Sequence, residues 1–514
     1  MNLILYGPPG SGKTTVGQLA ARQLGREFID FDDAIEKQWG RPVPDYFFGG
    51  DERLFREREA EMCRTVAARD DVVAAPGGGT LLNPRNRAGL EGTGTLVGLT
   101  ASLETLLGRL EGSYARPLLA GDRRARLAGL LKEREGLYRS LPISVDTEGI
   151  PAQAVAEAVV ARFHAEAGRV RFDMGASSAV MGRGLLARLP EWMAERNLRA
   201  PYVVISDSNV GPRHGPSVCR ALDGAGQPVL FEAGEAHKTL DSIREMYGAC
   251  VARGLDRHGT VAALGGGVVG DMAGFVAATY MRGVRWVNLP TTVLAMADAS
   301  LGGKVGYDLP EGKNLVGAFH TPALVEADFD TLATLPEAEV RNGMAEVIKS
   351  AVIGDADLFA RLSAGTVGLE AAVARAAAVK VGIVNADLYE RAERATLNLG
   401  HTVGHGIEAA SGYVWPHGEA VSVGMAVAAW LAQALGLAEA GLLEAVTACL
   451  ERAGLPTRCP GLSAAAIRAA MASDKKKAGG QLKFVLPKKL GEVAWGIVVE
   501  EKLQAEALRW VTGG

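Results

Sequence analysis

The sequence predicts an α/β protein made of a parallel-sheet domain, a second α/β domain and a mainly helical domain. A buried strand enters a glycine loop at residues 2–14, and a second strand, glycine turn and helix pattern lies at 261–283. After residue 330, Ala and Leu recur at helical spacing. Because 514 residues are too many for one ordinary core, we expect domains at 1–165, 172–330 and 331–514.

The composition is ordinary for a globular protein, with 48% hydrophobic and 22% charged residues. A net charge of −4 and a single short basic run at 475–477 argue against a nucleic-acid partner. Five cysteines are scattered without a CxxC pair, which favours a reduced, cytoplasmic setting. No leader segment and no run of about 20 apolar residues is visible. We therefore expect small-molecule partners and no membrane partner.

The first domain opens with NLILYGPPGSGKTT, which fits the pattern GxxxxGK followed by Ser or Thr between a strand and a helix. Backbone N–H groups of such a loop and the N-terminus of its helix bind phosphates. Lys13 would neutralise the β and γ phosphates, and Thr14 would hold Mg²⁺. A chance match is the alternative, and the position between strand and helix argues against it. We predict that this domain binds ATP and Mg²⁺.

Polar groups that could hold a small anionic acceptor follow this loop. The stretches FIDFDDAIEK, FREREAE, AAPGGGT, ARPLLAG and LYRSL supply carboxylates, arginines and glycines. Taken singly, each arginine fits a solvated surface charge. In this order, the stretches make residues 1–165 similar to shikimate kinase, which implies a parallel sheet of the nucleoside-monophosphate-kinase type. A non-catalytic, nucleotide-binding regulatory module is the alternative.

This resemblance implies particular roles, since a carboxylate with three hydroxyls suits arginine forks and an acceptor. The implied shikimate contacts are Asp32, Arg56, Gly78, Gly79 and Arg139. The implied ATP contacts are Gly7, Gly10, Gly12, Lys13, Thr14, Thr15, Arg109 and Arg116. Lys13 and Arg116 would act on the transferred phosphoryl group, and Thr14 with Asp30 would hold Mg²⁺. Phe31 and Pro76 depart from the family pattern without removing any of these groups.

The second domain contains a candidate dinucleotide turn. The strand PYVVISD ends at Asp207, and VAALGGGVVGD places three glycines between a strand and a helix. Such a turn suits a pyrophosphate, although glycine turns of this kind also serve ordinary packing of a helix on a strand.

The helical domain places three histidines and two glutamates within residues 398–419. His401 and His405 are four apart, so a helix would set both rings on one face. His417 follows a turn, and upstream Glu346 shares a helical face with Lys349. Two imidazoles and a carboxylate suit a divalent transition metal with an open position. Surface or hydrogen-bonded core histidines are the alternative.

The stretches LNLGHTVGHGIEA, AEVIK and LPTTVLAMADASLGGKVGYDLPEGKN resemble 3-dehydroquinate synthase. This resemblance implies a Rossmann-like α/β domain, a helical domain, NAD⁺, and Zn²⁺ or Co²⁺ held by Glu346, His401 and His417. The implied NAD⁺ contacts are Asp207, Asn209, Glu235, Lys238, Gly266, Gly267, Asp271, Thr291, Thr292, Lys313 and Thr334. The implied substrate contacts are Arg282, Asp298, Lys304, Asn314, Lys349, Lys380, Arg394, Asn398 and His405, of which Lys304, Lys349 and His405 would take part in catalysis.

The resemblance further implies a homodimer through the second half, and a reaction in which hydride passes to NAD⁺, phosphate leaves and hydride returns. Another sugar-phosphate cyclase acting on a heptulose 7-phosphate is one alternative, and a plain polyol dehydrogenase is another. Either Lys475 or Lys476 would touch substrate. Leu388 and Ala392 stand where the family usually has acidic residues.

Overall fold

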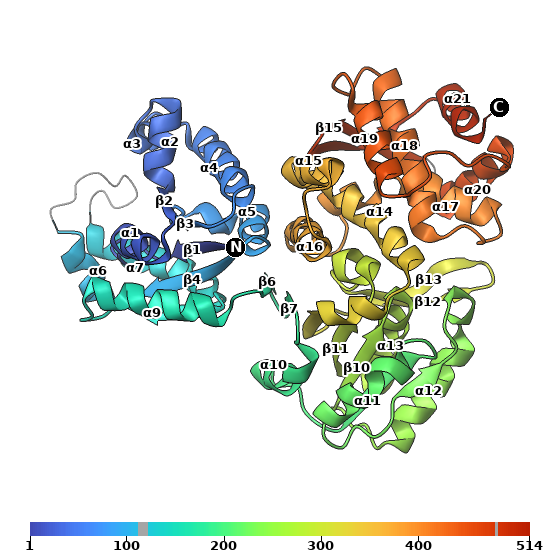
Figure 1. The fold of residues 1–514 in the computed structure, drawn as a ribbon, viewed down its shortest axis with the longest axis horizontal. Coiled ribbons are helices and arrows are strands. Elements are labelled where there is room, and N and C mark those ends of the chain that lie inside the picture. The colour runs from blue at the N-terminus through green and yellow to red at the C-terminus, as the bar shows by residue number, and fades with distance from the viewer. Residues whose placement is uncertain (112–121, 478–481, 514) are drawn as a thin grey trace. The chain divides into compact units, whose positions relative to one another are not determined.

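The structure is a computed structural model that describes residues 1–111, 122–477 and 482–513, without the side chains of 473–477. Arg116, and the side chains of Lys475 and Lys476, therefore lie outside the described residues. The chain forms two compact units, Met1–Asp173 and Met174–Gly514 (Figure 1).

The first unit is a parallel sheet with strand order β2-β3-β1-β4-β5. Its strands are β1 (Asn2–Tyr6), β2 (Glu27–Asp30), β3 (Val72–Ala75), β4 (Gly94–Thr100) and β5 (Ile143–Asp146). Its helices are α1 (Lys13–Leu24), α2 (Phe31–Trp39), α3 (Val43–Phe48), α4 (Glu52–Ala67), α5 (Pro84–Glu91), α6 (Leu103–Arg109), α7 (Arg123–Glu133), α8 (Glu135–Arg139) and α9 (Ala152–Ala165).

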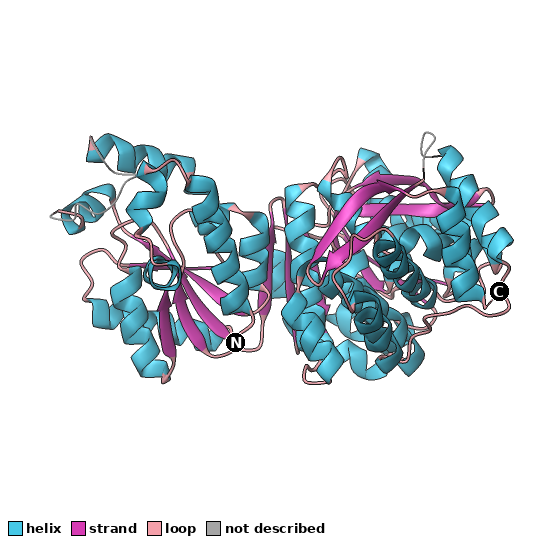
Figure 2. Cartoon of the chain, turned by 90° about the horizontal axis from the view of Figure 1, so that it is seen from above, coloured by secondary structure: helices cyan, strands magenta, loops and turns pink. Residues whose placement is uncertain are grey.

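Strand β1 is buried on both faces, as a parallel strand between helices must be. Leu3 and Leu5 pack with Val16 of α1 and Val159 of α9. Their neighbours Ile4 and Tyr6 pack in a separate cluster with residues of α2, α4 and α5. The helices of this unit accordingly cover both sides of its sheet (Figure 2). Phe31, which departs from the family pattern, is fully buried in the second cluster and serves as a core residue.

The second unit begins with another parallel sheet, in which the order from β7 onward is β7-β14-β11-β10-β8-β9. The strands are β6 (Val170–Met174), which crosses the division between the units, β7 (Ser177–Gly182), β8 (Tyr202–Asp207), β9 (Val229–Phe231), β10 (Thr260–Gly265), β11 (Arg285–Pro290) and β14 (Leu324–Asp328). Helices α10 (Leu189–Glu195), α11 (Gly211–Ala221), α12 (Leu240–Ala252) and α13 (Gly267–Thr279) flank it, and β12 (Lys304–Leu309) and β13 (Gly312–Phe319) form an antiparallel hairpin.

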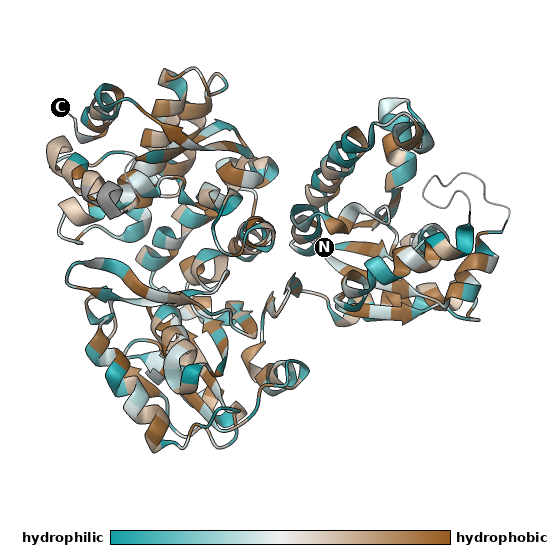
Figure 3. Ribbon diagram, turned by 180° about the vertical axis from the view of Figure 1, so that it is seen from behind, coloured by the Kyte–Doolittle hydropathy of each residue, from teal (hydrophilic) through white to brown (hydrophobic). Residues whose placement is uncertain are grey.

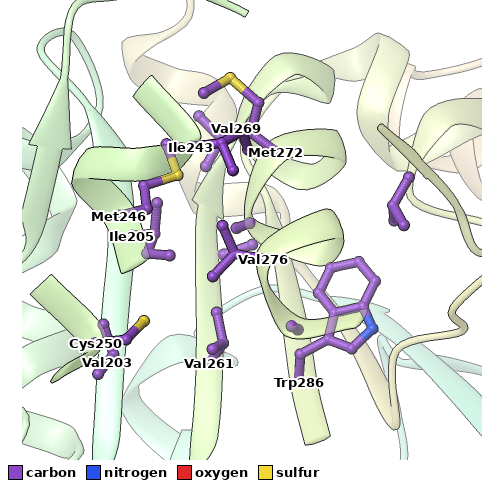
Figure 4. Packing of buried hydrophobic residues seen from close by; sticks show 14 of the residues in the cluster. Val203, Ile205, Ile243, Met246, Cys250, Val261, Val269, Met272, Val276 and Trp286 are labelled. Atoms are coloured by element: carbon purple, nitrogen blue, oxygen red, sulfur yellow. The ribbon is translucent and has the colours of Figure 1, made fainter. Parts of the chain in front are cut away.

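The core on one face of this sheet is drawn in Figure 4, where Val203 and Ile205 of β8 meet Met272 and Val276 of α13, with Trp286 beside them. Residues that alternate with these, such as Val204 and Leu264, belong to a second cluster with α10 and α11. The strands of both units are correspondingly hydrophobic in Figure 3. Each face of the sheet is therefore sealed by helices, which leaves the strand ends as the place for polar chemistry.

The rest of the second unit is mainly helical, as predicted for residues after 330. It contains α14 (Glu337–Gly354), α15 (Ala356–Ala364), α16 (Leu369–Ala386), α17 (His401–Ala410), α18 (His417–Ala434), α19 (Leu442–Arg452), α20 (Ala464–Lys477) and α21 (Glu501–Thr512), with an antiparallel pair of strands, β15 (Lys483–Lys489) and β16 (Glu492–Val498). Within the described residues, no helix is long and apolar enough to span a membrane. The five cysteines are unpaired, and Cys219 on α11 is the least buried of them.

Candidate active sites

The glycine loop between β1 and α1 lies at the N-terminus of a helix. Gly10 and Gly12 have φ values of 83° and 94°, a region that favours glycine. A Cβ atom on Gly10 would lie 2.9 Å from the carbonyl oxygen of Leu106. The Nζ atom of Lys13 donates a hydrogen bond to the carbonyl of Gly7 at 2.8 Å. The lysine therefore folds back over a loop whose N–H groups stand at the start of a helix.

The two groups predicted to hold Mg²⁺ are adjacent. The Thr14 hydroxyl donates to Oδ2 of Asp30 at 2.7 Å. Asp30 ends β2, and its Oδ1 atom caps α2 by accepting a hydrogen bond from the Asp32 amide at 3.1 Å. A hydroxyl and a carboxylate are the oxygen donors that Mg²⁺ prefers. The cap fixes the carboxylate in place beside the glycine loop.

Four of the five predicted shikimate contacts come together at the carboxyl end of β3. A Cβ atom on Gly79 would lie 2.5 Å from a guanidinium nitrogen of Arg56, and one on Gly77 would lie 3.3 Å from Oδ1 of Asp32. Arg56 is held by a hydrogen bond of 2.6 Å to Oε2 of Glu59, which is buried. The glycines thus let a charged cluster approach the backbone closely.

The fifth predicted contact, Arg139, lies differently. Its side chain is 78% exposed and forms an ion pair with Glu135 at 2.6 Å. Arg134, five residues earlier, is only 6% exposed and donates a hydrogen bond to the carbonyl of Gly78. The sequence interpretation missed Arg134, which occupies the junction between α7 and α8.

Arg109, predicted to pack on adenine, ends α6 and lies beside the glycine loop. Its guanidinium donates to the carbonyl of Thr147 at 2.7 Å and reaches within 3.5 Å of the carbonyl of Gly10. These bonds hold the guanidinium plane at the flank of the loop, where an adenine ring could stack on it.

A cavity of about 1270 Å³ lies in the second unit, at the carboxyl ends of β8 and β10. Asp207 ends β8 and turns the chain by accepting hydrogen bonds from the amides of Asn209 and Val210 at 2.9 and 2.8 Å. All of the predicted NAD⁺ contacts line this cavity: Asp207, Asn209, Glu235, Lys238, Gly266, Gly267, Asp271, Thr291, Thr292, Lys313 and Thr334.

Lys238 is the buried cation of this cavity, with 3% of its side chain exposed. Its Nζ atom donates to Oδ2 of Asp271 at 2.7 Å and to Oδ1 of Asn314 at 2.5 Å. Burial alone would lower the pKa of this ammonium, but Asp271 and Glu235 outweigh burial and raise the pKa above its ordinary value. Lys238 therefore stays charged and keeps two groups of the cavity wall in position.

Glu346 of α14, His401 of α17 and His417 of α18 meet at one point. Oε1 of Glu346 lies 3.6 Å from Nε2 of His401 and 3.5 Å from Nε2 of His417. The edge of a tetrahedron of ligands around Zn²⁺ is about 3.3 Å for bonds of about 2.0–2.1 Å. Oε2 of the buried Glu346 pairs with Nζ of Lys349, whereas Oε1 accepts no hydrogen bond of normal geometry from the described residues. A buried carboxylate left in this state beside two imidazole nitrogens fits a divalent metal.

Electrostatics lower the pKa values of Glu346 and His401, so both are unprotonated, but raise the pKa of His417. Burial raises the pKa of Glu346, but Lys349 and the histidines outweigh it and lower the pKa to about 2. Burial, and then the charge of Lys349, lower the pKa of His401 to about 3. For His417, burial is outweighed by the carboxylates of Glu346 and Glu408, which raise its pKa to about 9 in the metal-free protein. A metal at this point would compete with one proton, carried by His417.

The helices that carry these ligands are packed unusually closely. A Cβ atom on Gly424 of α18 would lie 1.9 Å from the carbonyl oxygen of Gly400, the residue before α17. Gly404 of α17 likewise faces the backbone of Val421 at 3.2 Å. Glycine at these positions sets the distance between the two histidine-bearing helices.

A second cavity of about 610 Å³ adjoins the first, since His401, His405, His417, Asp271, Asp298 and Asn314 line both. Eight of the predicted substrate contacts line it: Asp298, Lys304, Asn314, Lys349, Lys380, Arg394, Asn398 and His405. Arg282, the ninth, is absent from the described lining of either cavity.

Asp298 lies in a π-helical turn, Ala295–Ala299, and receives two lysines. Its Oδ2 atom accepts from Lys349 at 3.1 Å and its Oδ1 atom from Lys380 at 2.8 Å. π-Helical turns are often found at functional sites because they redirect one side chain. Here the turn aims one carboxylate between two ammonium groups.

Two further acidic residues of the site were missed in the sequence. Glu390, with φ at 56°, pairs with Lys304 and accepts a hydrogen bond from Asn398 at 3.1 Å. Glu408, three residues after His405 on α17, lies 3.4 Å from Nδ1 of His417. The spacing of three on a helix was the available signal for Glu408.

Together, the folds and sites define a P-loop phosphotransferase unit followed by a unit that combines a dinucleotide cavity with a metal-ligand set. A family model for shikimate kinase matches residues 9–164. Models for the N-terminal and C-terminal parts of 3-dehydroquinate synthase match residues 228–342 and 343–477. The 3-dehydroquinate synthase of Symbiobacterium thermophilum is 46% identical over 345 residues, which are 64% of this chain and 95% of that protein.

Among solved structures, 2-epi-5-epi-valiolone synthase from Streptomyces hygroscopicus, with NAD⁺ and Zn²⁺ bound, is 29% identical, with a TM-score of 0.60 over 66% of this chain and 98% of that chain. Shikimate kinase from Acinetobacter baumannii is 36% identical over 32% of this chain and 94% of that chain, with a TM-score of 0.31. The chain belongs to the 3-dehydroquinate synthase family and carries a shikimate kinase domain before it, so it is a bifunctional enzyme of the shikimate pathway.

Proposed function

We propose that the first unit transfers the γ-phosphoryl group of ATP to shikimate, and that the second converts 3-deoxy-D-arabino-heptulosonate 7-phosphate to 3-dehydroquinate and phosphate. The observation that carries the second assignment is the pair of adjoining cavities, one lined by the dinucleotide groups and the other by lysines, an arginine and the three histidines. A substrate with both a carboxylate and a phosphate suits such a cationic wall.

In the first unit, Lys13 and the loop N–H groups bind the ATP phosphates, and Thr14 with Asp30 holds Mg²⁺. Asp32 and Arg56 bind the hydroxyl and carboxylate groups of shikimate, beside the backbone of Gly78 and Gly79. The proposed guanidinium contact is Arg134 in place of Arg139, because Arg134 is buried against Gly78. Arg116 remains a proposed lid residue that lies outside the described residues.

In the second unit, Glu346, His401 and His417 hold Zn²⁺ or Co²⁺, and the first cavity holds NAD⁺. When bound, NAD⁺ accepts and returns a hydride, and the metal polarises substrate oxygens. Lys304, Asn314, Arg394 and Asn398 orient the anionic groups of the substrate. Lys349 and Lys380 stay aimed into the cavity through Asp298, and His405 lies within reach of a substrate proton. Enclosure in one cavity limits the reactive conformers of the substrate.

Another sugar-phosphate cyclase is the second candidate, because the solved valiolone-type synthase shares the fold at 29% identity. The higher identity of 46% to a 3-dehydroquinate synthase favours the acidic seven-carbon substrate. A comparison of phosphate release from the acidic heptulosonate phosphate and from a neutral heptulose 7-phosphate tests this choice. Faster turnover of the neutral sugar would overturn the assignment.

The domain limits, the oligomeric state and the cellular location are also part of the proposal. We propose domain limits at 1–165, 172–330 and 331–514, a homodimer through the second half and a cytoplasmic location. The division after Asp173 supports the first limit, and the unpaired cysteines support the location. Light scattering of the purified chain, and of a fragment that begins at Met174, tests whether the dimer resides in the second half.

Separate sites for the two reactions are tested by two substitutions in the full chain. Lys13→Met should abolish shikimate-dependent ADP formation and leave phosphate release from the heptulosonate phosphate intact. His401→Ala should do the reverse. Loss of both activities in either folded variant would contradict two independent sites.

A further inference from the structure

His417 belongs to two groups of residues that could hold a metal ion, and each of its two ring nitrogens faces one of these groups. Its Nε2 atom faces Glu346 and His401, whereas its Nδ1 atom lies 3.4 Å from Oε2 of Glu408. An imidazole that offers Nε2 to a metal carries its proton on Nδ1 and can donate it. The geometry of Glu408 therefore matches a carboxylate that accepts this hydrogen bond.

The second cluster, His405, Glu408 and His417, is better explained as support for the first than as a metal site of its own. Glu408 is 4% exposed, and its other oxygen accepts a hydrogen bond from Nζ of Lys313 at 3.1 Å. An ammonium at that distance already neutralises the carboxylate and would repel a second cation. Glu408 is left with one oxygen for Lys313 and one for His417.

Lys313 extends this chain of contacts to the nucleotide cavity. It lies on β13, its Nζ atom is 3.7 Å from Oε1 of Glu235, and it stands 4.7 Å over the ring of Tyr413. Glu235 and Lys313 both line the cavity assigned to NAD⁺. A ligand that approaches Glu235 will change how Lys313 is shared between its ion pair with Glu235 and its hydrogen bond to Glu408.

We propose that Glu408 is a positioning residue that fixes the tautomer and orientation of the metal ligand His417, and that Lys313 couples it to Glu235, so that NAD⁺ and the metal bind interdependently. The inference rests on the proposed function, since it takes Glu346, His401 and His417 as the metal ligands. Coupling of this kind is reciprocal, so each ligand changes the affinity of the other by the same factor.

The test titrates the metal-free full chain with Co²⁺ and follows the visible absorption of the bound ion, with and without saturating NAD⁺. For Glu408→Gln, we expect a Co²⁺ affinity about 10–100-fold weaker and an altered band, as is usual when the partner of a ligating histidine is lost. For Lys313→Met, we expect the NAD⁺ dependence of the Co²⁺ affinity, about 5–150-fold in the parent chain, to fall towards one.

The matched control is Glu326→Gln, which also replaces a fully buried glutamate of the second unit but lies on β14, outside both cavities. It should bind Co²⁺ as the parent chain does. Near-ultraviolet circular dichroism establishes that each variant keeps its tertiary packing.

The outcomes separate the inference from the proposed function. Unchanged affinity and absorption in folded Glu408→Gln would overturn the positioning role. Equal NAD⁺ dependence in Lys313→Met and the parent would overturn the coupling. Co²⁺ binding that survives His401→Ala undiminished would instead overturn the proposed metal site, and with it the basis of the inference.

Discussion

Lys380 and Asp298 form a hydrogen bond of 2.8 Å across 82 positions of sequence. Both side chains are largely buried, with exposures of 10% and 16%. Burial lowers the pKa of Lys380, while the two lysines together hold the pKa of Asp298 well below its ordinary value in spite of burial. One carboxylate thus pairs with two lysines at the wall of the substrate cavity.

Asp298→Asn removes this shared counter-charge and should abolish most synthase activity while sparing the kinase. Breaking a buried ion pair by removing one partner costs roughly 3–5 kcal/mol, so we also expect a lower melting temperature for the second unit. Parallel assays of phosphate release and ADP formation, with calorimetry, measure the effects. Asp241→Asn, at an 82% exposed aspartate, is the control. Full synthase activity in Asp298→Asn would refute the role.

Arg134→Gln should weaken shikimate binding far more than Arg139→Gln. Loss of a hydrogen bond from a charged donor costs roughly 1.5–3 kcal/mol, which predicts a KM for shikimate about 10–150-fold higher. Arg139 is exposed and paired with Glu135, so its change should leave KM within about two-fold. Steady-state kinetics with varied shikimate decide between the two arginines. The opposite ranking would restore Arg139 as the contact.

Glu91 predicts a pH dependence of stability in the first unit. Burial raises its pKa to about 7 from an ordinary 4.5 in spite of its ion pair with Arg87. The folded chain therefore keeps a proton that the unfolded chain releases between these values. The free energy of unfolding falls as the pH rises through that window, by at most about 3 kcal/mol.

Glu91→Gln should remove this decline, because its side chain stays neutral at every pH. Pulse proteolysis in urea at pH 5 and pH 7.5, read by mass spectrometry of peptides from residues 1–173, gives the stability of this unit. We expect the parent to lose more stability than the variant between the two pH values. Parallel losses would show that Glu91 titrates normally.

Gly424→Ala tests the close approach of α17 and α18. The added methyl would lie 1.9 Å from the carbonyl of Gly400, so the helices must separate. Overpacking of this kind costs roughly 1–3 kcal/mol, and we expect weaker Co²⁺ binding as well. Gly248→Ala on α12 is the matched control, since a Cβ there meets nothing within 4 Å. It should be neutral or slightly stabilising.

The sequence predicts the fold class and most of the residues that line the candidate sites, because both follow from local sequence patterns. The glycine loop lies between a strand and a helix, and His401 with His405 is readable from a helical repeat. Arg134 was missed because it lies where α7 passes into α8, with no proline at the junction to mark the break. Only the tertiary structure shows which of two arginines five residues apart turns inward.

Pairings between residues far apart in the chain could not be predicted from the sequence either. Asp298 meets Lys380, and Lys313 meets Glu408 across 95 positions. Nothing local specifies such partners, because they are fixed by how α16 and α17 lie against the π-helical turn Ala295–Ala299 and the β12–β13 hairpin. Arg282 shows the converse: the resemblance places it at the substrate phosphate, yet it is absent from the described cavity linings.

The five cysteines differ in exposure, which allows one of them to be labelled selectively. Cys63, Cys250, Cys449 and Cys459 are buried, and burial raises the pKa of each thiol, so they resist alkylation. Burial raises the pKa of Cys219 as well, but its thiol is partly exposed on α11, the helix that also brings Arg213 and His214 to the nucleotide cavity. A maleimide fluorophore would therefore attach first at Cys219. Occupancy of that cavity could then be followed by fluorescence in the unaltered sequence.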